Sequence, residues 1–126
     1  MPEPIVFISH SAVKEGKLEA FQELSQEVFP MLEADKPGTV FQYGYVDAAE
    51  TEIHFVHVFP DAEAMDAHML GAGERSGKAA QYIETREFEI YGKPSEEALS
   101  MLRQTPGVAV VVRPMGVGGF IRLGDR

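Results

Sequence analysis

The segment EIHFVHVFPDAEAMDAH, residues 52–68, decides the fold, because its hydrophobic pattern changes from that of a strand to that of a helix. From Glu52 to Phe59, apolar and aromatic residues occupy both alternating sets of positions, which predicts a strand with two buried faces. Pro60 ends that strand, and Asp61 is a residue type that caps helix N-termini. We therefore expect a strand followed at once by a helix over Ala62 to about Leu70.

The chain before this segment predicts two more strands and one more helix. Val40 to Val46 alternates in the same way and lies a turn-length gap before Glu52, which predicts an antiparallel hairpin. Apolar residues at every third or fourth position predict a helix from about Lys14 to Ala34. The apolar run Ile5 to Ser9 predicts a first strand, also buried on both faces, and His10 ends this strand before a loop, where we expect it to be exposed.

The chain after residue 70 predicts a looser stretch and then four elements. Three glycines are expected to loosen the chain before a short helix over Lys78 to Thr85 and a strand from about Arg86 to Gly92. Ser95, followed by two glutamates, predicts the cap of a helix that ends near Gln104. A strand over Val108 to Val112 and a glycine-rich tail complete the chain.

The element order over residues 4–92 is β-α-β-β-α-β, which predicts an α+β fold of the ferredoxin-like, split β-α-β kind with an antiparallel sheet. Helices on one face of such a sheet would leave the other face, also apolar here, without cover. The simplest cover is a second copy of the chain, sheet against sheet, so we expect a homodimer. The alternatives are that the C-terminal segment or a different protein covers that face.

Composition excludes several classes of function. The 126 residues are 44% hydrophobic and lack cysteine, which excludes disulfide scaffolds, thiol catalysis and cysteine-based metal sites. A net charge of −9 disfavours nucleic-acid binding, although residues 98–126 alone carry four arginines against one aspartate. That basic tail is expected to lie against an acidic surface or, alternatively, to bind an anion. No signal peptide or membrane span is evident, so we expect a cytoplasmic protein.

Three segments resemble the antibiotic biosynthesis monooxygenase-like family of dimeric α/β barrels. They are Val13–Phe21, Lys36–Thr39 and Val56–His68, the last with the strand–Asp–helix order and an Ala-His pair. The resemblance implies a family-like domain over residues 1–92, with 93–126 as a C-terminal helix-strand extension on the same domain or on its dimer mate. The family includes cofactor-independent oxygenases of phenols and quinols and heme-degrading enzymes, but this chain has no tryptophan, which disfavours heme degradation.

Histidines are the side chains best suited to proton transfer near neutral pH. His68 lies on the apolar stripe of its helix and matches the Ala-His pair, so it is the candidate catalytic residue; the alternative is a structural core histidine. Tyr43, His57 and Tyr82 are the candidate substrate-binding residues, with aromatic core packing or a subunit contact as alternatives. His54 and His57 should face opposite sides of their strand. No pair of histidines has metal-ligand spacing, so we expect no metal site.

The function that these residues and the resemblance predict is a cofactor-independent monooxygenase-like reaction on a small aromatic, quinol or polyketide-type molecule, with O2 as co-substrate and no cofactor. A non-catalytic small-ligand-binding or interaction domain is the main alternative, because a shared fold does not carry a shared reaction. An isomerase or lyase on the same scaffold is a third possibility.

Overall fold

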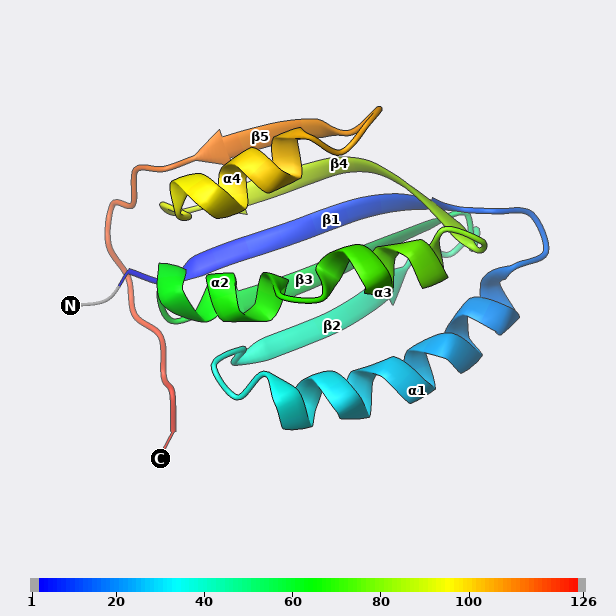
Figure 1. The fold of residues 1–126 in the computed structure, drawn as a ribbon, viewed down its shortest axis with the longest axis horizontal. Coiled ribbons are helices and arrows are strands. Elements are labelled where there is room, and N and C mark those ends of the chain that lie inside the picture. Colours follow the sequence, from blue (N-terminus) through cyan, green and yellow to red (C-terminus); the bar gives the residue numbers. More distant parts are fainter. Residues whose placement is uncertain (1–2, 125–126) are drawn as a thin grey trace.

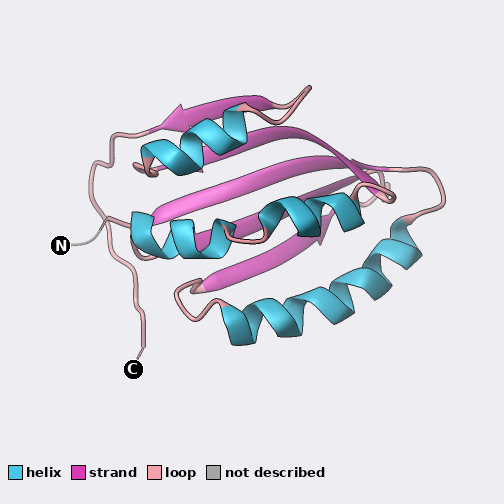
Figure 2. Cartoon of the chain, in the orientation of Figure 1, coloured by secondary structure: helices cyan, strands magenta, loops and turns pink. Residues whose placement is uncertain are grey.

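Over residues 3–124, which this computed structural model describes, five strands and four helices form one layer of helices on one layer of sheet (Figures 1 and 2). The elements are β1 (Ile5–Val13), α1 (Leu18–Asp35), β2 (Phe41–Val46), β3 (Glu52–Phe59), α2 (Ala62–Met69), α3 (Ala72–Ala79), β4 (Ile83–Tyr91), α4 (Glu96–Arg103) and β5 (Ala109–Arg113).

The sheet has the strand order β2-β3-β1-β4-β5, with β1 at its centre. The β2–β3, β3–β1 and β1–β4 pairs are antiparallel, and β5 joins the edge of β4 in parallel. All helices lie on one side of this sheet (Figure 2). The expected ferredoxin-like α+β fold is therefore confirmed, with the C-terminal helix and strand added at one edge.

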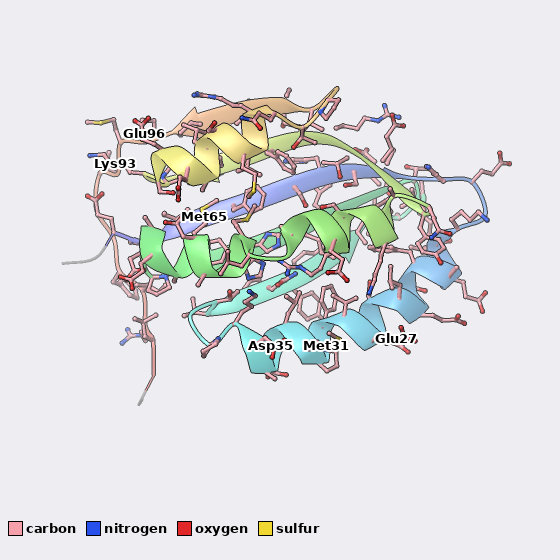
Figure 3. All side chains as sticks on the ribbon, in the orientation of Figure 1. Glu27, Met31, Asp35, Met65, Lys93 and Glu96 are labelled. Carbon is pink, nitrogen blue, oxygen red and sulfur yellow. The ribbon has the colours of Figure 1, made fainter. Side chains whose placement is uncertain are left out.

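The core lies between the sheet and the helices and has two parts. The larger part joins β1, β3 and β4 to α2 and α4, and Met65 of α2, labelled in Figure 3, is fully buried within it together with Phe59 and Ile90. The smaller part joins α1 to the other end of the sheet through Phe21, Ile53 and Ile83. The opposite side of α1 is exposed to solvent (Figure 3); its labelled residues are Glu27, Met31 and Asp35.

Both predicted helix caps are present. Asp61 accepts a hydrogen bond of 2.8 Å from the backbone N–H of Ala64, and Ser95 accepts one of 3.0 Å from that of Ala98. The Ser95 hydroxyl also donates to Asp66 Oδ1 at 2.6 Å, which ties the start of α4 to α2. These contacts fix where both helices begin, next to the strands that precede them.

The helix expected over Lys78 to Thr85 is wrong. The glycine-containing stretch before it forms α3 instead, and the chain is already in β4 at Ile83, which pairs with Val13. Two basic side chains bind backbone carbonyls that flank α3. Arg75, within the helix, donates to the carbonyl of Leu70, and Lys14, from the loop after β1, donates to that of Ala80. These bonds compensate for the low helix propensity of the glycines.

The first strand is longer than expected and continues beyond His10. It continues to Val13, so α1 begins at Leu18 after a turn in which Gly16 has a φ of +73°. His10 pairs with His54 on one side and Glu87 on the other, and its side chain is 23% exposed. The expectation of a solvent-exposed histidine after the strand is therefore wrong.

The sheet face away from the helices is open. Phe41, Tyr43 and Tyr45 lie on it, with 40%, 59% and 53% of their surfaces exposed. The C-terminal segment, described as far as residue 124, leaves these rings uncovered. In the view of Figure 1 it runs past the end of the sheet on the side of the N-terminus. Asp125 and Arg126 of the basic tail lie outside the described residues. None of the described helices is long and apolar enough to cross a membrane.

Candidate functional site

His57 of β3 lies on the helix-covered face of the sheet and is buried. Its Nδ1 atom is 2.9 Å from the carbonyl oxygen of Phe7, and its ring stacks on the Phe7 ring with centroids 4.9 Å apart. A carbonyl oxygen can only accept a hydrogen bond, so Nδ1 carries the proton and Nε2 of the neutral ring holds a lone pair. Burial lowers the pKa of His57 to about 4, which keeps the ring neutral at physiological pH.

His68 of α2 lies beside His57, with ring centroids 5.3 Å apart in an edge-to-face arrangement. It is buried, and its Nδ1 atom forms a hydrogen bond of 2.7 Å with the Thr39 hydroxyl. Burial is the main cause that lowers the pKa of His68 to about 3, and repulsion from a protonated His57, from Arg75 and from Lys36 contributes to the same shift. Two neutral imidazoles, one from a strand and one from a helix, thus lie next to each other in the interior.

Lys36 and Arg75 hold the end of α2 in place. Lys36 Nζ donates to the carbonyls of Ala67 and Leu70 at 2.8 and 3.1 Å, and Arg75 donates to the carbonyl of His68 at 2.8 Å. Positive charges are favourable at a helix C-terminus, where carbonyl groups lack helical partners. The same two cations make a protonated His68 costly, because they repel its positive charge.

The loop between α1 and β2 packs closely against α2, and this places Thr39 beside His68. A Cβ atom at Gly38 would lie 3.0 Å from the Cβ of Ala64 in α2, which is tighter than ordinary van der Waals contact. Glycine therefore lets the loop pack against α2, and the next residue presents its hydroxyl to the imidazole. The local sequence Lys36-Pro37-Gly38-Thr39 thus supplies both a helix-capping cation and a histidine partner.

A groove of about 480 Å³ lies between the end of α1 and β2, next to this pair. Thr39 and Gln42 line it, and Gln42 is the register partner of His57. Neither imidazole Nε2 atom has a hydrogen-bond partner, and among the described residues no fully enclosed polar side-chain atom lacks one. Both Nε2 atoms therefore touch accessible space. The groove reaches the pair through Thr39 and Gln42, and neither histidine itself lines it. A second groove of similar volume, at the start of α1, has no histidine in its lining either and none of these neighbours.

The four residues predicted from the sequence do not form one site. His57 and His68 lie together. Tyr43 does not join them, because its register partner is Val56, which places it on the open face of the sheet. Tyr82 precedes β4 and packs against Phe21 with centroids 6.3 Å apart, within the smaller part of the core. His54 faces away from His57, as its position in the strand predicts.

Three residues beside the histidines were not predicted from the sequence: Thr39, Lys36 and Arg75. Lys36 and Thr39 belong to a segment whose only signal in the sequence is its resemblance to the family. Arg75 lies in α3, which the sequence pattern did not predict. The signal that could have found Arg75 is its place within one or two helical turns of the predicted end of α2, where basic residues are favourable.

Comparison with solved structures identifies chains of the same fold. MupZ from Pseudomonas fluorescens superposes with a TM-score of 0.69 at 19% identity, over 95% of each chain. SnoaB from Streptomyces nogalater, a cofactor-independent oxygenase, superposes with a TM-score of 0.60 at 12% identity, over 74% of this chain and 95% of that one. The chain has the fold of the antibiotic biosynthesis monooxygenase-like proteins.

A third similar structure comes from Bacteroides thetaiotaomicron, and its assignment as an antibiotic biosynthesis monooxygenase is provisional. It has a TM-score of 0.57 at 13% identity and covers 70% of this chain and 85% of that chain. No family model matches the chain, and no curated protein matches it. At these identities the likeness concerns the fold and leaves the reaction to be argued from the site.

Proposed function

We propose that the chain is a cofactor-independent monooxygenase-like enzyme that oxidises a small aromatic, quinol or polyketide-type molecule with O2. The observation that carries the proposal is the buried pair of neutral imidazoles, His57 and His68, whose neighbours Thr39 and Gln42 line a groove. The fold shared with the oxygenase SnoaB supports the same reaction class. His68 is the proposed proton acceptor, and His57 is proposed to bind the substrate hydroxyl.

The proposed reaction begins with a phenolic substrate in the groove. When Nδ1–H of His68 donates to the Thr39 hydroxyl, its Nε2 lone pair can accept the phenolic proton. The resulting imidazolium and phenolate form an ion pair, and the phenolate supplies the negative charge that the site otherwise lacks. The low pKa of His68, caused mainly by burial, therefore belongs to the empty site and should rise when a phenolate lies beside it.

The remaining steps need no metal or organic cofactor. The electron-rich anion passes one electron to O2, and the two radicals recombine to a peroxide anion, which takes the proton back from the His68 imidazolium to become a hydroperoxide. Loss of water from this hydroperoxide leaves the carbonyl of a quinone, so one oxygen atom enters the product and the other leaves as water. The protein's part is to remove the proton, to orient the ring and to limit the access of water.

The alternative function is a small-ligand-binding domain without catalysis. The observation that favours it is that burial holds the pKa of His57 at about 4 and that of His68 at about 3, well below the value of a base poised for neutral pH. Neutral imidazoles of this kind can donate and accept hydrogen bonds to a bound hydroxyl without moving its proton. Such a domain would bind the same aromatic molecules and leave them unchanged.

Oxygen uptake distinguishes the two functions. Metal-free protein is mixed with a panel of hydroquinones and polycyclic phenols, and the rate of autoxidation is subtracted. The enzyme proposal expects saturable uptake that falls at least tenfold in His68→Ala and is retained in His54→Ala, whose side chain faces the other side of the sheet. Tight ligand binding without uptake would establish the binding domain instead, and full activity of His68→Ala would remove His68 from the role of base.

We also propose that a second copy of the chain covers the open face of the sheet. Support comes from the exposed aromatic row Phe41, Tyr43 and Tyr45, which shares this face with the apolar residues Val56 and Val58 of β3. A contiguous apolar patch on a sheet face is typical of a protein interface. A two-fold related copy would present the same patch and would bury both.

A further inference from the structure

A cluster of one histidine and two glutamates lies on the open face of the sheet, away from the His57–His68 pair. His10 of β1 is the register partner of Glu87 of β4, and Glu89 follows two residues later on the same face. His10 Nε2 lies 3.8 Å from Glu87 Oε2 and contacts Glu89 Oε1 directly. One nitrogen and two carboxylate oxygens therefore converge, all within 4.8 Å of one another.

These spacings suit a single metal ion. Ligands that bind a tetrahedral ion at about 2.1 Å lie roughly 3.4 Å from each other. The distance between His10 Nε2 and Glu87 Oε2 is close to that value, and the His10–Glu89 contact would open slightly to admit an ion. In the single chain the three side chains are 23%, 40% and 17% exposed, so an ion from solvent can reach them before a second copy covers this face.

In His10 and Glu89, the atom that would point away from a metal already has hydrogen-bond partners. Such partners usually orient the side chains that bind metals in proteins. His10 Nδ1 lies 3.2 Å from His54 Nε2, so an Nδ1–H donated there leaves the His10 Nε2 lone pair for a metal. The second oxygen of Glu89 accepts hydrogen bonds from the Tyr91 hydroxyl at 2.9 Å and from Arg113 at 3.1 Å. The cluster therefore has both candidate ligands and the partners that would orient them.

The backbone holds the ligands on rigid elements. Glu87 and Glu89 are two residues apart on one strand, so both carboxylates project from the same face. The β1–β4 register shifts between His10 and Ser11, which is a bulge beside the histidine. Bulges of this kind re-aim side chains and are common next to functional sites.

Charge and ligand type indicate which ion fits. The two carboxylates carry two negative charges and Arg113 carries one positive charge, so the cluster has a net charge of about −1. The exposed Glu52 carboxylate, 3.7 Å from His54, adds negative charge nearby. Imidazole nitrogen favours Zn²⁺ and similar transition metals, whereas Mg²⁺ and Ca²⁺ prefer sites made of oxygen alone. We propose that His10, Glu87 and Glu89 bind a divalent transition-metal ion of the zinc type on the open face of the sheet.

Calorimetric titration of the metal-free full chain with Zn²⁺ tests the site. We expect one ion per chain, at least tenfold weaker binding in Glu87→Gln and in His10→Ala, and no comparable binding of Mg²⁺. Glu84→Gln is the matched control, because Glu84 lies on the same strand and pairs with the exposed Arg86 outside the cluster. His68→Ala is a second control, since it removes a histidine of the buried pair and should leave Zn²⁺ affinity unchanged.

The outcomes separate this site from an adventitious one. Unchanged affinity in Glu87→Gln, or loss of binding in His68→Ala with retention in His10→Ala, would overturn the proposal. Glu87 is the most exposed of the three, so its glutamine variant should fold normally, and circular dichroism checks this. The oxygen-uptake experiment uses metal-free protein and concerns the other face of the sheet, so the two proposals succeed or fail independently.

Discussion

Lowering the pH from 7.5 to 5.0 should destabilise the folded chain by about 4 kcal/mol through His57 and His68 alone. Burial lowers the pKa of both imidazoles, from 6.5 to about 4 for His57 and about 3 for His68. The unfolded state therefore takes up protons below pH 6.5, whereas the folded state does not until the pH approaches 4. The stability that these groups supply is complete above pH 6.5 and is lost as the pH falls.

The magnitude follows from the unfolded state. At pH 5 an imidazole with a pKa of 6.5 is protonated about thirty times more often than it is neutral, which favours unfolding by about 2 kcal/mol for each histidine. This value changes little whether the folded pKa is about 3 or about 4, because the folded ring is still neutral at pH 5.

Urea unfolding at a series of pH values measures the effect. His57→Gln and His68→Gln remove one titrating group each, so each variant should lose about 2 kcal/mol less than the wild type over the same pH interval. Both variants also lose a hydrogen bond, which lowers stability at every pH and leaves the slope unaffected. If either variant has the wild-type pH dependence, that histidine is not held neutral by burial, and the description of the site is wrong.

Two further predictions concern packing. Tyr43→Glu places a charge on the open face and should convert a dimer to monomers in analytical ultracentrifugation. The control Met31→Glu, on the exposed side of α1, should remain dimeric. A wild-type chain that already sediments as a monomer would contradict the proposed dimer. Gly92→Ala should lower the free energy of unfolding by about 1–3 kcal/mol, because the residue has a φ of +110° and its Cβ would lie 2.9 Å from the Pro4 carbonyl oxygen. Gly107→Ala, at a φ of +73° with open space around it, should lose less in the same urea titration, and equal losses would rule out the contact with Pro4.

The main features of the fold could be predicted from the sequence, because local patterns determine them. Alternation in β3 separates His54 from His57, and Asp61 and Ser95 cap their helices through their own side chains. The same local signals failed for α3. Its glycines predict a loose chain, and only tertiary hydrogen bonds, such as Arg75 to the carbonyl of Leu70, explain why it is helical.

The site could be predicted only in part, because it depends on register and on loops. The positions of His57 and His68 follow from a strand and a helix that are adjacent in sequence. Tyr43 was grouped with them because strand pairing is not visible in the sequence, and a shift by one residue changes the face of every side chain. No pair of histidines has metal-ligand spacing in the sequence, and the carboxylates beside His10 come from a strand distant in sequence, so local spacing does not reveal this cluster.

The central place of β1 affects how the chain can be made. This strand precedes both of its neighbours in the chain, so it leaves the ribosome well before β3 and β4 are synthesised. Until Tyr91 has emerged, at least one edge of the apolar run Ile5–Ile8 has no partner, and such an edge can pair with other chains. Folding should therefore be completed only when most of the chain is available. Fragments that stop before β4 should aggregate, whereas losses from the C-terminal tail should be tolerated better, since they leave both neighbours of β1 in place.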